Sequence, residues 1–173
     1  VDDKWKDSMD DYNVMLVTIG RSSTENGTYL PGVDGVDASQ NLNQTDPLGL
    51  SDDERDLINA AVEAKENNGG KVIVMLNNAN AMEIDEIKNN DGVDAIMEIG
   101  FPGGYGFYGV ADILSGEANP SGHLTDTYAV TNANSPAAQN FGNYEWTNAD
   151  PSVNINAEEV EAEDIYTGYK LSL

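Results

Sequence analysis

The sequence predicts an α/β domain in which a mostly parallel sheet carries helices on both faces, a three-layer sandwich. Three apolar runs of strand length alternate with segments of helical periodicity, at Tyr12–Gly20, Lys71–Leu76 and Asp94–Ile99. Strands alternating with helices in this way form parallel sheets through right-handed crossovers. The first run is almost continuously apolar, so we expect it to be buried on both faces of the sheet.

The longest predicted helix follows a loop, Arg21–Gly49, that is rich in Gly, Ser, Asn and Asp. Ser51 and Glu54 are spaced as a capping box, which marks a helix N-terminus. Leu57, Ile58, Ala61 and Val62 then recur at helical spacing, and Gly69 and Gly70 end the helix. Shorter helices are expected over Val1–Asp11 and Met82–Lys88.

Residues 100–122, which follow the third run, contain several sequence signals for turns and a helix. A glycine-rich corner, Gly100–Gly104, precedes a helix over Tyr105–Leu114, and Gly116 takes the C-cap position. The apolar stripe of this helix is expected to comprise Phe107, Val110, Ala111 and Leu114. Asn119-Pro120-Ser121-Gly122 predicts a turn, with positive φ at the glycine.

Composition excludes some classes of partner. The 173 residues carry 31 Asp+Glu against 8 Lys+Arg, a net charge of −23, which disfavours nucleic acid and anionic membrane surfaces. A neutral sugar is compatible with such a surface. No apolar run approaches the roughly 18 residues of a membrane span. The absence of cysteine suits a cytoplasmic and a secreted bacterial protein equally, so the compartment is left open.

Several motifs with a possible chemical role have a simpler structural interpretation. Gly104-x-Gly106-x-x-Gly109 matches the dinucleotide fingerprint, but its helix runs into a proline turn instead of the second strand that holds the ribose. A single histidine, His123, cannot form a histidine metal cluster. Asn90-Asp91-Gly92 lacks the alternating acids of an EF-hand loop, because Ile87 falls at the first ligand position. We therefore predict no cofactor and no metal.

Two further sets of side chains are expected to serve structure. Glu98 lies within the third predicted strand, where a buried acid needs a partner, and we place it at a sheet end or interface. Tyr105, Phe107 and Tyr108 are expected to pack against the domain, with a sugar-binding platform as the alternative.

The amino-acid sequence of this region resembles that of a known family. The corner FPGG, the helix VADILSG and the segment NPSGHLTDTY are similar to the α/β sandwich domain of family 3 glycoside hydrolases, which include β-glucosidases and β-xylosidases. The segment IYTGYK near the end of the chain is also similar to the family. The resemblance implies a single sandwich domain over residues 1–173, with 130–173 an irregular extension packed on it. Because family domains begin with one or two strands before the position of Tyr12, we expect an incomplete sandwich.

The resemblance also implies a candidate catalytic residue. Loop residues Gly20–Gly27, GRSSTENG, are similar to a family loop whose glutamate serves as the general acid/base, and Glu25 falls on that position. Thr24 and Asn26 replace family glycines, so the backbone path near Glu25 can differ. The alternative is an exposed loop acid without a catalytic role.

The function implied is that of a sandwich domain in a retaining β-glycosidase that hydrolyses neutral β-linked oligosaccharides or aryl glycosides. In the family the nucleophile belongs to a barrel domain, which is therefore the expected partner, and we predict that this chain alone is inactive. The alternative is a non-catalytic carbohydrate-binding or structural domain. An uncovered sheet edge also predicts self-association or a complementary chain.

Overall fold

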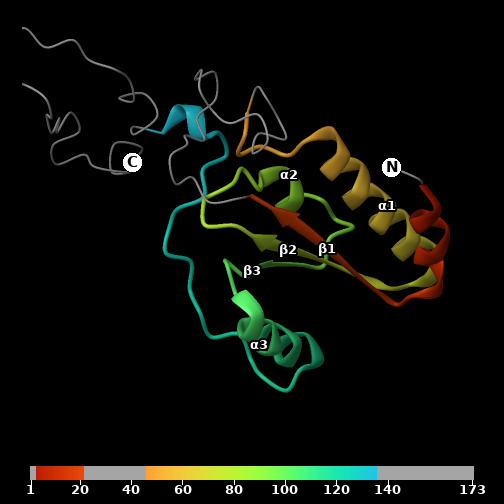
Figure 1. The fold of residues 1–173 in the computed structure, drawn as a ribbon. Helices are drawn as coiled ribbons and strands as arrows, with labels where there is room; N and C mark the ends of the chain where they lie inside the picture. Colours follow the sequence, from red (N-terminus) through yellow and green to blue (C-terminus); the bar gives the residue numbers. More distant parts are fainter. Residues whose placement is uncertain (1–2, 22–45, 136–173) are drawn as a thin grey trace, which may run out of the picture. The chain divides into compact units, whose positions relative to one another are not determined.

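The computed structural model describes residues 3–21 and 46–135, and the chain divides into two compact units, Val1–Val130 and Thr131–Leu173. The elements of the first unit, in chain order, are η1 (Asp3–Asp11), β1 (Val14–Gly20), α1 (Asp52–Asn68), β2 (Lys71–Asn77), α2 (Asp85–Lys88), β3 (Ala95–Glu98) and α3 (Gly103–Ser115) (Figure 1). The described part of the second unit holds the short 3-10 helix η2 (Asn132–Asn134). Glu25 and the IYTGYK segment lie outside the described residues. The expectation that 130–173 packs on the domain stays a prediction.

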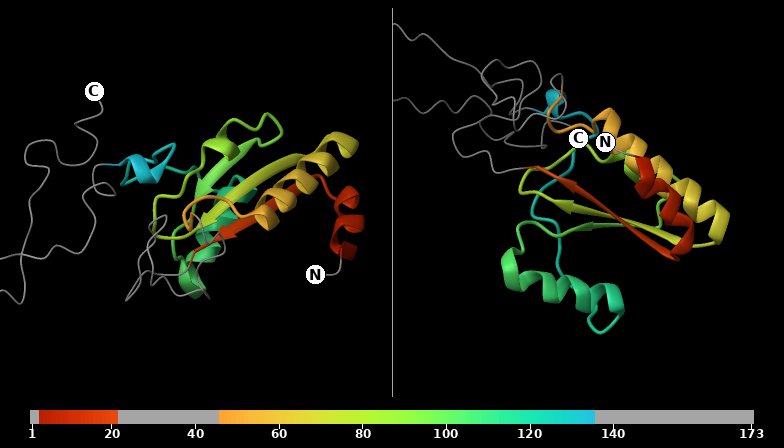
Figure 2. Two further views of the ribbon diagram at one scale, coloured as in Figure 1. Left: turned by 90° about the horizontal axis from the view of Figure 1, so that it is seen from above. Right: turned by 45° about the vertical axis from the view of Figure 1, so that its right-hand side comes forward.

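The three described strands form one parallel sheet in the order β1-β2-β3. Its register aligns Ile19 with Leu76 and Leu76 with Glu98, so the carboxyl ends of all three strands lie at one edge. Helices α1 and α2 lie on one side of the sheet and α3 lies on the other (Figures 1 and 2). The predicted α/β class, the parallel pairing and the helices on both faces are confirmed.

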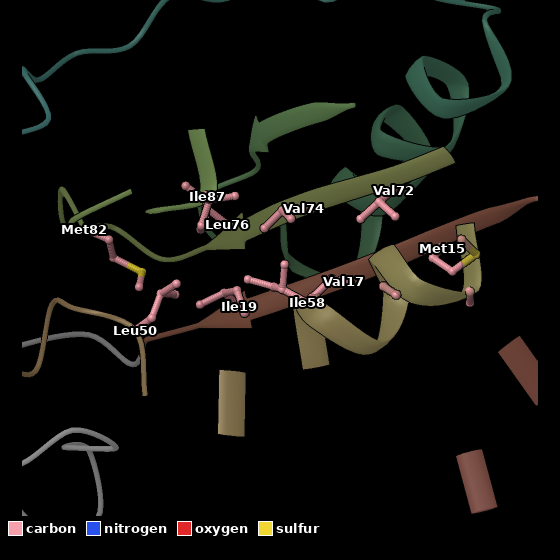
Figure 3. Close-up of a cluster of buried hydrophobic side chains, with 12 residues drawn as sticks. Met15, Val17, Ile19, Leu50, Ile58, Val72, Val74, Leu76, Met82 and Ile87 are labelled. Carbon is pink, nitrogen blue, oxygen red and sulfur yellow. The ribbon is translucent and has the colours of Figure 1, made fainter. Parts of the chain in front are cut away.

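The hydrophobic core lies on the α1 side of the sheet. Alternate residues of β1 and β2 point into it and meet one face of α1 (Figure 3). Its buried members are Met15, Val17, Ile19, Leu50, Ile58, Ala61, Ala64, Val72, Val74, Leu76, Met82 and Ile87. Burial of these apolar side chains is the main stabilising contribution to such a domain.

The prediction that β1 is buried on both faces is wrong. Met15, Val17 and Ile19 are buried, whereas Val14 and Leu16 are 50% and 47% exposed. The apolar run alone could not show this, because burial of the second face depends on whether another layer packs against it. In the described part of the chain, no element covers that face of β1.

Helix α1 has the predicted boundaries. The Ser51 Oγ accepts a hydrogen bond from the Glu54 N–H at 3.2 Å, and a Glu54 carboxylate oxygen accepts one from the Ser51 N–H at 2.9 Å. These two bonds complete the capping box. At the other end, Gly69 adopts φ 74°, the left-handed conformation that glycine takes without steric cost.

Helix α3 departs from the prediction in its start and in its inner face. It begins at Gly103, because Pro102 already has helical φ and ψ and its carbonyl accepts the Gly106 N–H at 2.9 Å. None of its residues is buried. Gly116 is the C-cap as expected, with φ 82°.

Two smaller differences concern turns and short helices. Gly122 is not among the described glycines with positive φ, so the predicted turn geometry at 119–122 is wrong. Helix α2 covers only Asp85–Lys88 of the segment expected to be helical from Met82. Met82 is fully buried in the core and precedes the helix.

Candidate functional site

The carboxyl edge of the sheet is the place where an open α/β fold puts its ligands. β1 ends there at Gly20, and Gly20 pairs with Asn77 at the end of β2. The backbone N–H of Arg21 donates to the Asn77 carbonyl at 3.3 Å, and the Asn77 side-chain amide donates to the Gly100 carbonyl. Arg21 is the last described residue at this edge, and the residues that include Glu25 follow it in the sequence.

The side chain of Arg21 occupies the interior at this edge. It is 3% exposed, and its guanidinium donates hydrogen bonds to the carbonyls of Gly20, Pro47 and Gly49, each at 2.8 Å. Two further bonds reach the carboxylate of Glu54, from Nη1 at 2.5 Å and from Nη2 at 3.0 Å. A guanidinium has five N–H donors, so this network satisfies all of them.

Arg21 belongs to the loop sequence GRSSTENG, but the sequence alone did not indicate a role for it. The signal that was available is local: an arginine directly after a buried strand, in a chain with 8 basic residues. Its partners could not be read from the sequence, because Glu54 lies 33 residues further along the chain.

Glu98 has the structural role expected of it. One carboxylate oxygen accepts the Gly100 N–H at 2.8 Å and the other accepts the Tyr128 hydroxyl at 2.9 Å. Burial, together with the hydrogen bond to Glu98, raises the pKa of the Tyr128 hydroxyl above its ordinary value. The pair therefore fastens the segment after α3 to the end of β3.

A cavity of about 780 Å³ lies between β3, α3 and the segment 118–128. Helix α3 turns Gly106, Gly109, Val110 and Ile113 toward it. Of the predicted stripe of Phe107, Val110, Ala111 and Leu114, only Val110 lines the cavity. His123 lines the cavity from the opposite segment and is exposed. Small glycines on this face leave the space unfilled.

The aromatic side chains of α3 are not packed as we expected. Tyr105 is 89% exposed and Tyr108 is 70% exposed, with ring centroids 6.5 Å apart. Phe107 is half exposed. No described element of this unit packs over these three side chains.

Two buried polar atoms at the sheet edge have no hydrogen-bond partner: Asn78 Oδ1 and Asn80 Nδ2. Asn78 is held by its other side-chain atom, which donates to the Met82 sulfur at 3.2 Å. Within residues 3–21 and 46–135, no group of three or more His, Cys, Asp or Glu is arranged to hold a metal ion. Among the same residues, no helix is both long and apolar enough to cross a bilayer.

Comparison with known proteins places this architecture in a family. Residues 2–170 match the glycosyl hydrolase family 3 C-terminal domain, and the chain belongs to that family. This match confirms the resemblance to family 3 glycoside hydrolases that the corner, helix and loop sequences indicated.

The relatives are named as glycosidases. "Thermostable beta-glucosidase B" of Acetivibrio thermocellus is 28% identical over 136 residues, which cover 78% of this chain and 17% of that protein. "Probable beta-D-xylosidase 6" of Arabidopsis thaliana is 33% identical over 100 residues, 56% of this chain and 12% of the relative. "Probable beta-glucosidase F" of Emericella nidulans is 27% identical over 140 residues, 80% and 15% respectively. The chain spans between 8% and 17% of the length of such relatives.

Proposed function

We propose that this chain is the sandwich domain of a retaining β-glycosidase and contributes the general acid/base, Glu25, to an active site completed by a barrel domain. The substrates are neutral β-linked oligosaccharides and aryl glycosides. Family membership over residues 2–170, together with relatives named β-glucosidase and β-xylosidase, is the observation that carries the proposal. The acidic surface is compatible with a neutral substrate and unfavourable for an anionic one.

The position of the Glu25 segment supports the assignment. It follows β1 in the sequence, and β1 ends at the carboxyl edge of the parallel sheet, where loops of α/β folds bind ligands. A retaining enzyme needs two carboxyl groups about 5–5.5 Å apart, one of them a nucleophile. The second group is proposed to come from the barrel, so the site forms only when both domains are present.

The acid/base role predicts a dependence on the leaving group. A general acid donates its proton to the departing oxygen, so Glu25→Ala in the full-length protein should lower turnover of substrates with poor leaving groups about 10²-fold or more. Cleavage of an activated aryl glycoside needs no such proton and should suffer far less. Azide should restore turnover on the activated substrate by replacing the base-assisted water. The alkaline limb of the pH–rate profile should disappear.

The measurement is steady-state turnover of both substrates, with and without azide. Glu63→Ala removes an exposed acid from α1 and is the control, for which both activities should stay at the wild-type level. An equal loss on the two substrates without azide rescue would assign Glu25 to structure. Wild-type activity of Glu25→Ala would leave the non-catalytic carbohydrate-binding domain as the better interpretation.

A further inference from the structure

Two adjoining tyrosine rings lie on the surface of α3. Tyr105 is 89% exposed and Tyr108 is 70% exposed, with ring centroids 6.5 Å apart and ring planes tilted by 34°. Residues three apart share one side of a helix, and neither tyrosine lines the cavity between α3 and β3. A single exposed aromatic side chain is ordinary, but two adjoining rings form a surface on which a ligand can lie.

The helix neighbours of these rings leave them uncovered. Gly104 lies four residues before Tyr108, and Gly109 lies four residues after Tyr105. Larger side chains at these positions could cover the rings, because residues four apart are neighbours on a helix. A Cβ built at either glycine meets nothing within 4 Å. The tyrosine rings are therefore open to solvent on the sides where α3 carries glycine.

Asp112 adds a polar group to the same side of α3. It follows Tyr108 by four residues and Tyr105 by seven, and it is exposed. Its carboxylate makes no hydrogen bond or ion pair with another residue in the described part of the chain. It is also the only charged residue of α3. The surface therefore combines aromatic rings with one hydrogen-bond acceptor and has no group that attracts an anion.

This surface begins close to the carboxyl edge of the sheet. β3 ends at Glu98 and α3 begins at Gly103, on the arrowhead side of β3 (Figure 1). The Asn77 side chain, at the end of β2, donates to the Gly100 carbonyl in the connection between them. Tyr105 stands in the first turn of α3, near the edge at which open α/β sheets bind ligands.

We propose that Tyr105, Tyr108 and Asp112 form a binding surface for a neutral β-linked sugar chain. The choice of a sugar as the ligand rests on the function proposed above. The C–H groups on the face of a pyranose ring are weakly positive and apolar, and they suit the negative face of an aromatic ring. Hydroxyl groups at the edge of the sugar donate to the Asp112 carboxylate. Because two rings adjoin, an oligosaccharide gains more contact than a monosaccharide.

Affinity electrophoresis of the full-length protein tests the surface. Native gels contain a neutral β-glucan or xylan, and a gel without polysaccharide gives the reference mobility. Tyr105→Ala combined with Tyr108→Ala should raise the apparent Kd about tenfold or more, because truncation of an aromatic side chain at the centre of a contact commonly costs this much. Tyr105→Phe combined with Tyr108→Phe keeps both rings and should retain most of the retardation.

Tyr12→Ala is the matched control. Tyr12 is 61% exposed and precedes β1, so it lies at the opposite edge of the parallel sheet. Its substitution removes a ring of the same kind and should leave the retardation at the wild-type level. Polygalacturonate, an anionic polysaccharide, should retard neither the wild type nor the variants.

Three results would overturn the proposal. The first is equal retardation of the wild type and the double alanine variant, or no retardation of the wild type by β-glucan and xylan. The second is retardation by polygalacturonate that depends on the two tyrosines. The third is a melting temperature of the double alanine variant several degrees below that of the wild type with unchanged retardation, which would mean that the rings pack against another part of the protein.

The gels are independent of the kinetics of Glu25→Ala, because retardation requires no bond cleavage. If Glu25→Ala shows no leaving-group dependence, the proposed acid/base role fails while the gels still measure sugar binding by α3. If the double alanine variant is retarded like the wild type, the binding surface fails and the acid/base role stands.

Discussion

Asp94 directly precedes β3, and its carboxylate connects the start of that strand to α1 and β2. It accepts from Lys65 of α1 at 2.7 Å, from Lys71 of β2 at 2.8 Å and from the Val72 N–H at 2.9 Å. Hydrogen bonds from the two lysines, and then the one from the Val72 amide, hold the pKa of this carboxyl well below its ordinary range. Its contribution to stability is therefore a property of the ionised form.

This arrangement predicts how stability depends on pH. A carboxyl whose pKa is lowered on folding stabilises fully above its unfolded pKa, about 3.9 for aspartate. That contribution is lost as the pH falls through the folded-state pKa. Asp94→Asn should therefore lower the urea midpoint at pH 7, and the difference from wild type should shrink below about pH 4.

Urea denaturation of the chain at pH 7, 5 and 3 measures the effect. Asp91→Asn, at an exposed acid three residues earlier in the chain, is the control and should change the midpoint little. A difference between Asp94→Asn and wild type that is equally large at pH 3 and pH 7 would contradict the assignment.

Glycine at 92 allows the connection between α2 and β3 to approach α1 closely. A Cβ built at Gly92 would lie 2.2 Å from Cγ1 of Val62 and 2.7 Å from its Cγ2. The Gly92 carbonyl also accepts a hydrogen bond from Lys65 at 2.9 Å, which holds the connection in place. Because Val62 packs against the core, it has little freedom to move away.

We therefore expect Gly92→Ala to destabilise the chain by about 1–3 kcal/mol, the usual cost of overpacking. Gly109→Ala is the matched control, because a Cβ there meets nothing within 4 Å. In the interior of α3 the added methyl should instead stabilise by about 0.5–1 kcal/mol. Denaturant midpoints of both variants and of the wild type measure these changes in stability. Equal effects of the two substitutions would contradict the close contact between Gly92 and Val62.

Strand β1 leaves one apolar face and one edge uncovered among the described elements. Val14 and Leu16 are about half exposed, and β1 pairs only with β2 in the described sheet. Exposed strand edges pair with other strands. A net charge of −23 opposes the meeting of two copies, and salt screens that repulsion within about 8 Å at physiological ionic strength.

The isolated chain should therefore self-associate, or take up a complementary chain, and more so as salt is raised. Light scattering measures the mass at several salt concentrations. Leu16→Lys should reduce association, whereas Leu124→Lys, an exposed apolar residue outside the sheet, should not. A compact monomer in all conditions, with no further strand on β1, would overturn the expectation.

At the scale of the whole molecule, the proposed division of the active site predicts that the 173-residue chain hydrolyses no aryl β-glycoside above background. The physical reason is that the proposed nucleophile belongs to another domain. Purified chain assayed with an activated aryl β-glycoside, beside the full-length protein as positive control, measures this. Saturable turnover that a substitution in this chain abolishes would refute the division.

The local sequence determined the elements of this domain. The capping box at Ser51 and Glu54, the C-cap glycines 69 and 116, and the three apolar runs all predicted elements within a few residues of their observed bounds. They could be predicted because capping and strand formation depend on residues close together in the chain. The short sequence motifs of the family are also local, and they predicted the correct family for this chain.

The tertiary structure decided what lies on each face and which groups Arg21 binds. The exposed half of β1, the inner face of α3 and the open positions of Tyr105 and Tyr108 depend on which layers cover them. The partners of Arg21 lie 26 to 33 residues away at Pro47, Gly49 and Glu54. Packing and long-range hydrogen bonds are set by where the chain returns in space, and a pattern along the sequence does not contain that information.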